Sequence, residues 1–121
     1  MCERTDLQFI QDILESTNAA LSFVEGYDFD LFTGDRKTKS AAIRELEIIG
    51  EAASRISVNK KNIYSDIPWR FLKDFRNVLS HEYFGVNDRI VWDIIQNKLP
   101  FLKKQITNII TIEAKFSETH L

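Results

Sequence analysis

Apolar residues recur three or four positions apart along most of this chain, which is the spacing of one face of an α-helix. The first such stripe consists of Leu7, Ile10, Ile13, Leu14, Thr17, Leu21 and Val24. Only 4 glycines and 2 prolines interrupt the 121 residues, so residues that end helices or form tight turns are scarce. The pattern therefore favours a few long helices over a many-stranded sheet.

Capping residues and helix breakers divide this pattern into separate helices. We expect four main helices, from Thr5 or Asp6 to near Gly26, from Asp35 to about Ile56, from Pro68 or Trp69 to about Glu82, and from Asn87 or Asp88 onward. Gly85 interrupts the third helix, and Pro100 predicts either a kink or a restart that would give a fifth helix.

The connections are expected to be irregular. Residues 26–34 form the main loop, whose aromatic side chains pack on the bundle, and residues 58–66 form a polar connection with a solvated turn at residues 59–62. Residues 113–121 lose the helical periodicity and are expected to fray. The sequence thus predicts an all-α, up-and-down four-helix bundle in a single domain of residues 1–121.

The charge and cysteine content narrow the classes of function. A net charge of −2 argues against a high-affinity, non-specific binder of duplex nucleic acid, although it leaves room for a local basic cleft. The single cysteine, Cys2, cannot form an internal disulfide, which fits the cytoplasm. We expect no signal peptide and no membrane association, because the first residues are charged and no apolar run approaches the ~20 residues needed to cross a bilayer.

One stretch, residues 76–83, carries most of the ionisable chemistry and one of the 2 histidines. At ~100° per residue, an apolar sector of the third helix lies opposite a polar sector. The apolar sector holds Phe71, Leu72, Phe75, Val78 and Leu79, and the polar sector holds Lys73, Asp74, Arg76, Asn77, Ser80, His81 and Tyr83, while Trp69 and Glu82 fall on the wrong side. Arg76 and His81 are ~140° apart on this wheel, so they can meet only at a helix end or bend, or across two copies of the chain.

The residue types in this stretch suit RNA cleavage without a metal ion. A histidine such as His81, with an ordinary pKa of ~6.5, can take or give a proton near neutral pH. The guanidinium of Arg76 can bind a phosphate and stabilise charge that develops during phosphoryl transfer. Asn77 and Ser80 are supporting residues, and Asn77 is placed to orient His81 or the substrate. The alternative interpretation is a solvated polar helix face, with His81 bonded to Glu82 or to a backbone carbonyl.

Two further features bear on these interpretations. Glu45 falls inside the apolar stripe of the second helix, which predicts an ion pair, an exposed edge, or a role near the site or in a subunit contact. The sequence shows no cluster of histidine, cysteine and carboxylate residues with the spacing of metal ligands. We therefore expect neither a metal ion nor another cofactor.

Residues 76–83 match the R-x4-6-H pattern of HEPN-domain ribonucleases in its R-x4-H-x-Y form. The surrounding sequence resembles the HepT branch of that family at residues 46–53 (LEIIGEAA), 67–69 (IPW), 83–86 (YFGV) and 91–92 (VW). The resemblance covers roughly residues 5–110, and every motif position is filled by the expected residue type.

This resemblance implies the toxin of a toxin–antitoxin pair, an endoribonuclease that acts as a homodimer with Arg76 and His81 in a cleft between the motif helices. It also implies an MntA-type minimal nucleotidyltransferase as antitoxin, which silences the toxin by AMPylation of Tyr83. Glu51 belongs to the resembling stretch and is expected to act in the fold or at the dimer contact. The alternative is a non-catalytic helical module that binds a nucleotide or a partner protein.

Overall fold

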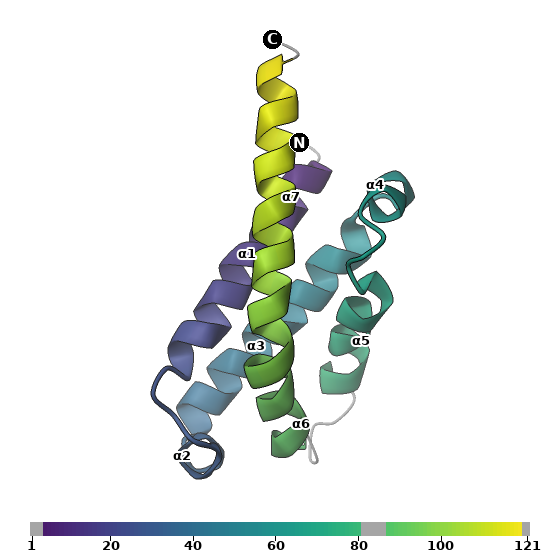
Figure 1. The fold of residues 1–121 in the computed structure, drawn as a ribbon. Coiled ribbons are helices and arrows are strands. Elements are labelled where there is room, and N and C mark those ends of the chain that lie inside the picture. The colour runs from purple at the N-terminus through teal and green to yellow at the C-terminus, as the bar shows by residue number, and fades with distance from the viewer. Residues whose placement is uncertain (1–3, 81–86, 120–121) are drawn as a thin grey trace.

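The computed structural model describes residues 4–80 and 87–119, and every regular element in these two ranges is helical (Figure 1). The elements are α1 (Asp6–Phe23), α2 (Phe29–Gly34), α3 (Arg36–Arg55), α4 (Val58–Ile63), α5 (Trp69–Ser80), α6 (Asp88–Asp93), the π-helix η1 (Ile94–Lys98) and α7 (Leu99–Thr119). The predicted all-α fold is confirmed. None of the helices in the described ranges is both long and apolar enough to cross a membrane.

The long helices begin at residues whose side chains cap them, at the positions that the sequence predicts. The Thr5 hydroxyl accepts the Gln8 backbone N–H at 3.2 Å, while the Gln8 side-chain oxygen accepts the Thr5 backbone N–H at 2.8 Å, which is a reciprocal capping box. Asp35 caps α3 by accepting the Thr38 N–H at 3.1 Å. Asn87 caps α6 in the same way.

Three segments predicted to be irregular are helical instead. The tail expected to fray from residue 113 continues α7 as far as Thr119, and the other two segments form short helices. Residues 29–34 of the expected loop are α2, capped by Asp28, which accepts the Leu31 N–H at 2.8 Å, and anchored by the fully buried Phe32. Residues 58–63 of the expected polar connection are α4, capped by Ser57. A helix of this length depends on its cap and on tertiary contacts, and it is too short to show a periodic pattern.

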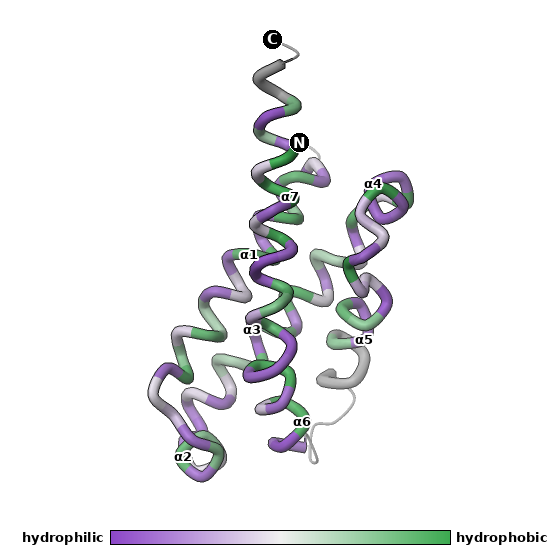
Figure 2. Tube along the Cα trace, in the orientation of Figure 1, coloured by the Kyte–Doolittle hydropathy of each residue, from purple (hydrophilic) through white to green (hydrophobic). Residues whose placement is uncertain are grey.

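The four long helices enclose one core. Adjacent helices pack in the order α5, α3, α1, α7, and α5 makes few contacts with α7 over the described residues (Figure 1). Figure 2 shows hydrophobic and hydrophilic residues alternating along each long helix, as expected when one face is buried. The largest fully buried side chains are Ile10, Ile13, Phe32, Leu46, Ile49, Ile95, Leu99 and Ile106.

The helical rod after Asn87 changes its winding next to Pro100. The π-helix η1 ends at Lys98, and α7 begins at Leu99, one residue before the proline. Proline lacks an N–H, and its ring collides with the carbonyl four residues earlier, which here is Gln96 in η1. The wider π turn accommodates this steric conflict. The interruption predicted at Pro100 is therefore a change from π-helix to α-helix.

Candidate active site

The start of α5 is held in place by Trp69. Its indole is 8% exposed, and its N–H donates to the Tyr64 carbonyl at 3.0 Å. The Pro68 carbonyl accepts the Leu72 N–H at 3.0 Å and so opens the helix. Leu72 and Phe75 are then buried as α5 packs along α3. These contacts fix the direction in which α5 presents its remaining faces.

Three of the five predicted site residues lie in the last turns of this helix. Arg76, Asn77 and Ser80 lie in the last turns of α5, where the structure describes the backbone. His81 and Tyr83 lie outside the described residues. The structure therefore places the first half of the motif on a helix whose orientation is set by buried residues just before it.

Burial along α5 tests the predicted helical wheel. Leu72 and Phe75 are buried as predicted, and Lys73 and Asp74 are exposed as predicted. The assignment of Phe71 to the core face was wrong, because its ring is 39% exposed and packs edge-on against Phe75, with 5.0 Å between ring centroids. Trp69 is buried despite its place on the wheel, since its indole lies over the preceding turn and bonds to Tyr64.

The chain that follows the motif is bound to α3, the helix against which α5 packs. The Lys39 ammonium on α3 donates to the Asp88 carboxylate at 3.0 Å, and the two side chains are 24% and 27% exposed. Arg89 lies over the Phe29 ring at 3.6 Å from its centroid. Both ends of the segment from Ser80 to Asn87 are thus tied to α3, one by apolar packing and the other by an ion pair.

Sequence reasoning missed this ion pair. Lys39 and Asp88 are 49 positions apart, and neither interrupts a local pattern. Asp88 stood out only as an alternative cap, a role that Asn87 fills. No signal in a single sequence marks such a contact, because helical phase shows which side of a helix is buried but not which neighbour it meets.

The two glutamates singled out from the sequence lie on α3, away from α5. Glu45 is half-buried in a shallow depression between α1 and α3, together with Asp12 and Glu15. Glu51 pairs with Arg55 one turn later at 3.1 Å, with the side chains 44% and 63% exposed. An exposed pair of this kind contributes little to stability, on the order of 0.3–0.5 kcal/mol.

The potential metal ligands are dispersed in the described part of the chain. Among residues 4–80 and 87–119, no group of three histidine, cysteine, aspartate or glutamate side chains could hold a metal ion. The cations on the exposed side of α5 are Arg70 and Lys73, both of which precede the motif on the same helix. These two cations lie in the first two turns of α5.

Comparisons with known proteins bear directly on this arrangement. The family model described as Ribonuclease HepT-like matches residues 13–109, most of the chain. "Putative RNase MJ0127" of Methanocaldococcus jannaschii is 42% identical over 102 residues, covering 84% of each chain. "Probable ribonuclease HepT" of Thermococcus cleftensis is 38% identical over 101 residues, covering 84% of this chain and 92% of that protein.

A third relative is "Putative RNase TTE0752" of Caldanaerobacter subterraneus subsp. tengcongensis, which is 36% identical over 110 residues and covers 91% of this chain and 98% of that protein. No solved structure matches the chain significantly. The matched region contains α3, α5 and the whole R-x4-H-x-Y stretch. The chain therefore belongs to the HepT-like ribonuclease family.

Proposed function

We propose that this protein is an endoribonuclease that cleaves RNA with Arg76 and His81 and without a metal ion. The observation that carries the proposal is an intact R-x4-H pair in the sequence, with Arg76 on α5, in a chain that the HepT-like ribonuclease family model matches over residues 13–109. Three relatives of similar length carry names that state ribonuclease activity.

In the proposed reaction, the substrate supplies the nucleophile. His81 takes the proton from a 2′-hydroxyl, and the 2′-oxygen forms a bond to the adjacent phosphorus. The bond from phosphorus to the 5′-oxygen of the next nucleotide breaks, and that oxygen receives a proton from histidine. The products are a 2′,3′-cyclic phosphate and a 5′-hydroxyl. Arg76 binds the phosphate oxygens and stabilises their charge, and Asn77 and Ser80 support the pair.

Two single substitutions test this proposal, with a matched control. His81→Ala and Arg76→Ala should each lower the cleavage rate of a single-stranded RNA by at least ~100-fold, the scale of a lost acid–base or charge-stabilising group. His120→Ala removes the other histidine and should retain the rate. EDTA should leave cleavage unchanged. Full activity of His81→Ala would refute the catalytic assignment, as would a rate that depends on added metal.

We also propose that the protein is a toxin of a toxin–antitoxin pair in the cytoplasm, and that it works as a homodimer. A nucleotidyltransferase antitoxin transfers AMP from ATP to Tyr83: the tyrosine oxygen forms a bond to the α-phosphorus, and pyrophosphate leaves. Tyr83 follows Arg76 by seven positions, about two helical turns. An adenylyl group there brings a phosphate near that guanidinium and competes with RNA for it.

Intact-mass analysis separates this regulation from the cleavage activity. Incubation with an MntA-type nucleotidyltransferase, together with ATP, should add one adenylyl group per chain and abolish cleavage. Tyr83→Phe should cleave RNA at the rate of the unmodified protein, gain no mass and stay active in the same mixture. A mass gain that maps to another residue would refute the role of Tyr83.

A further inference from the structure

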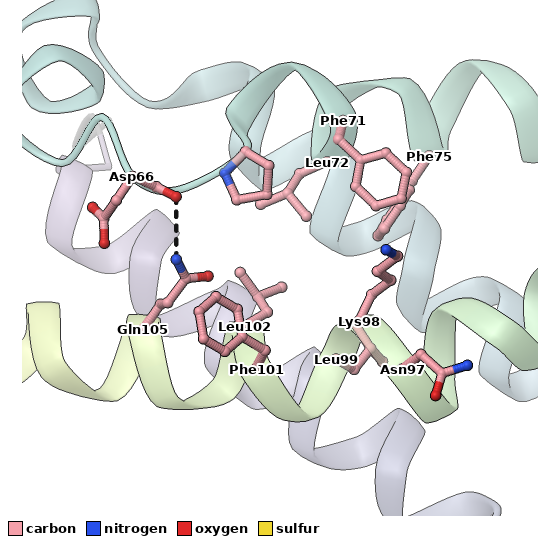
Figure 3. A pocket seen from close by; sticks show the side chains of 11 residues that line it. Asp66, Phe71, Leu72, Phe75, Asn97, Lys98, Leu99, Phe101, Leu102 and Gln105 are labelled. Atoms are coloured by element: carbon pink, nitrogen blue, oxygen red, sulfur yellow. Dashed lines mark hydrogen bonds between the residues drawn. The ribbon is translucent and has the colours of Figure 1, made fainter.

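A groove runs between α5 and the helical rod formed by η1 and α7. Its volume is about 460 Å³, within the range of about 300–1,000 Å³ that is usual for ligand sites. Most of its lining is apolar, with Phe71, Leu72 and Phe75 on the α5 wall and Leu99, Phe101 and Leu102 on the α7 wall. Figure 3 shows these two walls facing each other. The groove therefore has the size and the lining of a binding site for one small, flat, apolar group.

Two aromatic rings in the groove remain accessible to solvent. Phe71 on the α5 wall is 39% exposed, and Phe101 on the α7 wall is 64% exposed. Leu72 and Leu102, which line the same groove, are buried. Accessible aromatic rings on two facing walls are suited to a planar ligand, and unstacked nucleic acid bases stack on such rings.

Polar groups occupy the two ends of the groove. At one end the Gln105 amide N–H donates to the Asp66 carbonyl at 3.1 Å, and the Gln105 side-chain oxygen points into the groove (Figure 3). At the other end Lys98 extends toward Phe75 (Figure 3).

Lys98 is the only cation that lines the groove in the part of the chain that the structure describes. Its side chain is exposed and forms no ion pair with any residue of ranges 4–80 and 87–119. An ammonium group without a protein partner at the end of an apolar groove is suited to a phosphate.

The Lys98 end of the groove is the end nearest to the R-x4-H motif. Phe75 directly precedes Arg76, and Phe71 lies five positions before Arg76, roughly 7.5 Å along the helix axis. Nucleotides of one stacked strand advance ~3.4 Å each, so about two nucleotides cover this length. Arg76 lies ~100° around α5 from Phe75, an angle that a flexible single strand can follow and a stiff duplex cannot.

The combination of groups favours RNA over a segment of protein. Aromatic rings that accept a base, next to a cation that accepts a phosphate, are typical of sites for single-stranded nucleic acid. An apolar protein segment would cover the Gln105 oxygen without giving it a hydrogen-bond donor, at a cost in free energy. The carboxylates of Asp12, Glu15 and Glu45, which would repel a phosphate backbone, lie in the depression between α1 and α3.

We propose that this groove binds the base of a nucleotide that neighbours the cleaved phosphodiester in a single-stranded RNA. The base inserts between Phe71 and Phe101, and the Lys98 ammonium binds an adjacent phosphate. The Gln105 oxygen accepts a hydrogen bond from the edge of the base, which discriminates between bases by where they present an N–H group. This inference rests on the proposed ribonuclease function and adds a base-recognition subsite to it.

Binding of a fluorescein-labelled single-stranded RNA, followed by anisotropy, tests the groove without requiring cleavage. The protein is the His81→Ala variant, in which the proposed reaction is blocked. Phe101→Ala in this background should raise the dissociation constant by about 10-fold, the scale of one lost stack between a base and an aromatic ring. Phe116→Ala removes a similarly exposed ring on α7, outside the groove, and should leave binding unchanged. Equal dissociation constants for the two variants would overturn the subsite.

The salt dependence of the same binding tests Lys98. Lys98→Gln should reduce the slope of log affinity against log salt concentration by about 0.7, the value for one phosphate of a single strand. Lys103→Gln makes the same change of charge in a separate depression beside Leu21 and should leave the slope unchanged. A slope that Lys98→Gln does not alter would overturn the phosphate contact.

RNAs that carry one abasic nucleotide at successive positions identify the bound base. At one position the missing base should raise the dissociation constant by about 10-fold when Phe101 is present and by much less in Phe101→Ala, because ring and base lose the same contact. The absence of such a position would overturn the proposal. So would a Phe101→Ala variant that binds RNA normally but changes self-association or AMP transfer, since the groove would then contact a protein.

Two further measurements keep these outcomes distinct. Circular dichroism should show that every variant is folded, which is expected because Phe101 and Lys98 are exposed. Cleavage by the unsubstituted protein is assayed separately. RNA that binds through the groove and stays intact would refute the ribonuclease function while supporting the subsite, whereas cleavage that Phe101→Ala and Lys98→Gln leave unchanged on every RNA would refute the subsite alone.

Discussion

The Lys60 ammonium on α4 donates to the Glu113 carboxylate on α7 at 2.5 Å, across 53 positions of sequence. The two side chains are only 28% and 14% exposed, so water screens the pair weakly. The hydrogen bond to Glu113 is the main reason that the pKa of Lys60 is raised above its ordinary value, against an opposing effect of burial. The contact links α7 to the short helix that precedes α5.

Removing this ammonium should destabilise the fold. Lys60→Met leaves the Glu113 carboxylate mostly buried without its cation, and we expect the free energy of unfolding to fall by about 1–3 kcal/mol. Urea denaturation measures the change. The control is Arg55→Met, which breaks an exposed pair and should cost at most ~0.5 kcal/mol. Equal losses for the two variants would show that burial does not strengthen the Lys60–Glu113 contact.

The start of α3 should show a distinct dependence on acid. The Tyr27 hydroxyl donates to the Asp35 carboxylate at 2.6 Å, and Thr38 donates to it through its backbone N–H and its hydroxyl. These bonds, with that from Tyr27 the strongest, lower the pKa of Asp35 to about 2. Because the pKa is lower in the folded state, the stabilisation is present above pH ~4 and is lost as the pH falls toward 2.

Tyr27→Phe should raise the pKa of Asp35 toward its ordinary value of 3.8. The carboxyl carbon resonance of Asp35, followed by NMR against pH, measures this shift directly. The variant should be less stable than the wild type at neutral pH, and the difference should vanish near pH 2. In an Asp35→Asn background, the same substitution should have a much smaller effect on stability. An unchanged titration of Asp35 would exclude Tyr27 as the principal cause.

Thr17 offers a route to a more stable protein. Its side chain is fully buried in α1, and its hydroxyl has no hydrogen-bond partner among the described residues. Thr17→Val replaces this hydroxyl with a methyl group of similar size, so we expect a gain of about 1 kcal/mol in the free energy of unfolding. Thr107→Val, at an exposed position on α7, should change stability by less than ~0.5 kcal/mol. Thermal unfolding of both variants measures the difference, and a loss of stability in Thr17→Val would reveal a hidden partner for the hydroxyl.

Lys39 should position the proposed site without touching RNA. Lys39→Met removes the ion pair that ties Asp88 to α3, and a displaced motif segment should lower kcat by about 10-fold while KM changes little. Lys39→Arg keeps the charge and should restore most of the rate. Arg44→Met breaks an exposed pair elsewhere on α3 and serves as the control. A rate loss of the same size in the control, or one that follows thermal stability alone, would argue against positioning.

The sequence predicts the long helices well because their signals are local. Caps such as Thr5, Asp35 and Asn87 act within one turn, and apolar spacing shows which side of a helix is buried. The short helices α2 and α4 were missed because six residues cannot show a period. Phe71 was misassigned for a different reason. Helical phase identifies the apolar side of a helix but not whether another helix covers it, and α7 makes few contacts with α5.

The candidate site also has a part that local sequence signals predict and a part that depends on contacts between helices. The residue types and their spacing predict RNA chemistry at Arg76 and His81, and the family comparison supports a ribonuclease. The contact that anchors the far side of the motif depends on two residues from different helices. Such a contact is set by how helices pack in three dimensions, which a one-dimensional pattern does not encode.

Because α5 and α7 make few contacts, the helix that carries the motif and the last helix are held in place by different neighbours. The segment that carries the proposed chemistry is mounted on α3 at both ends, through Leu72 and Phe75 before it and Asp88 after it. The exposed apolar side chains of α7, such as Phe101 and Phe116, lie on a helix that is held mainly by α1. Substitutions on this exposed side of α7 can therefore change the surface of the protein while the mounting of the motif on α3 stays the same.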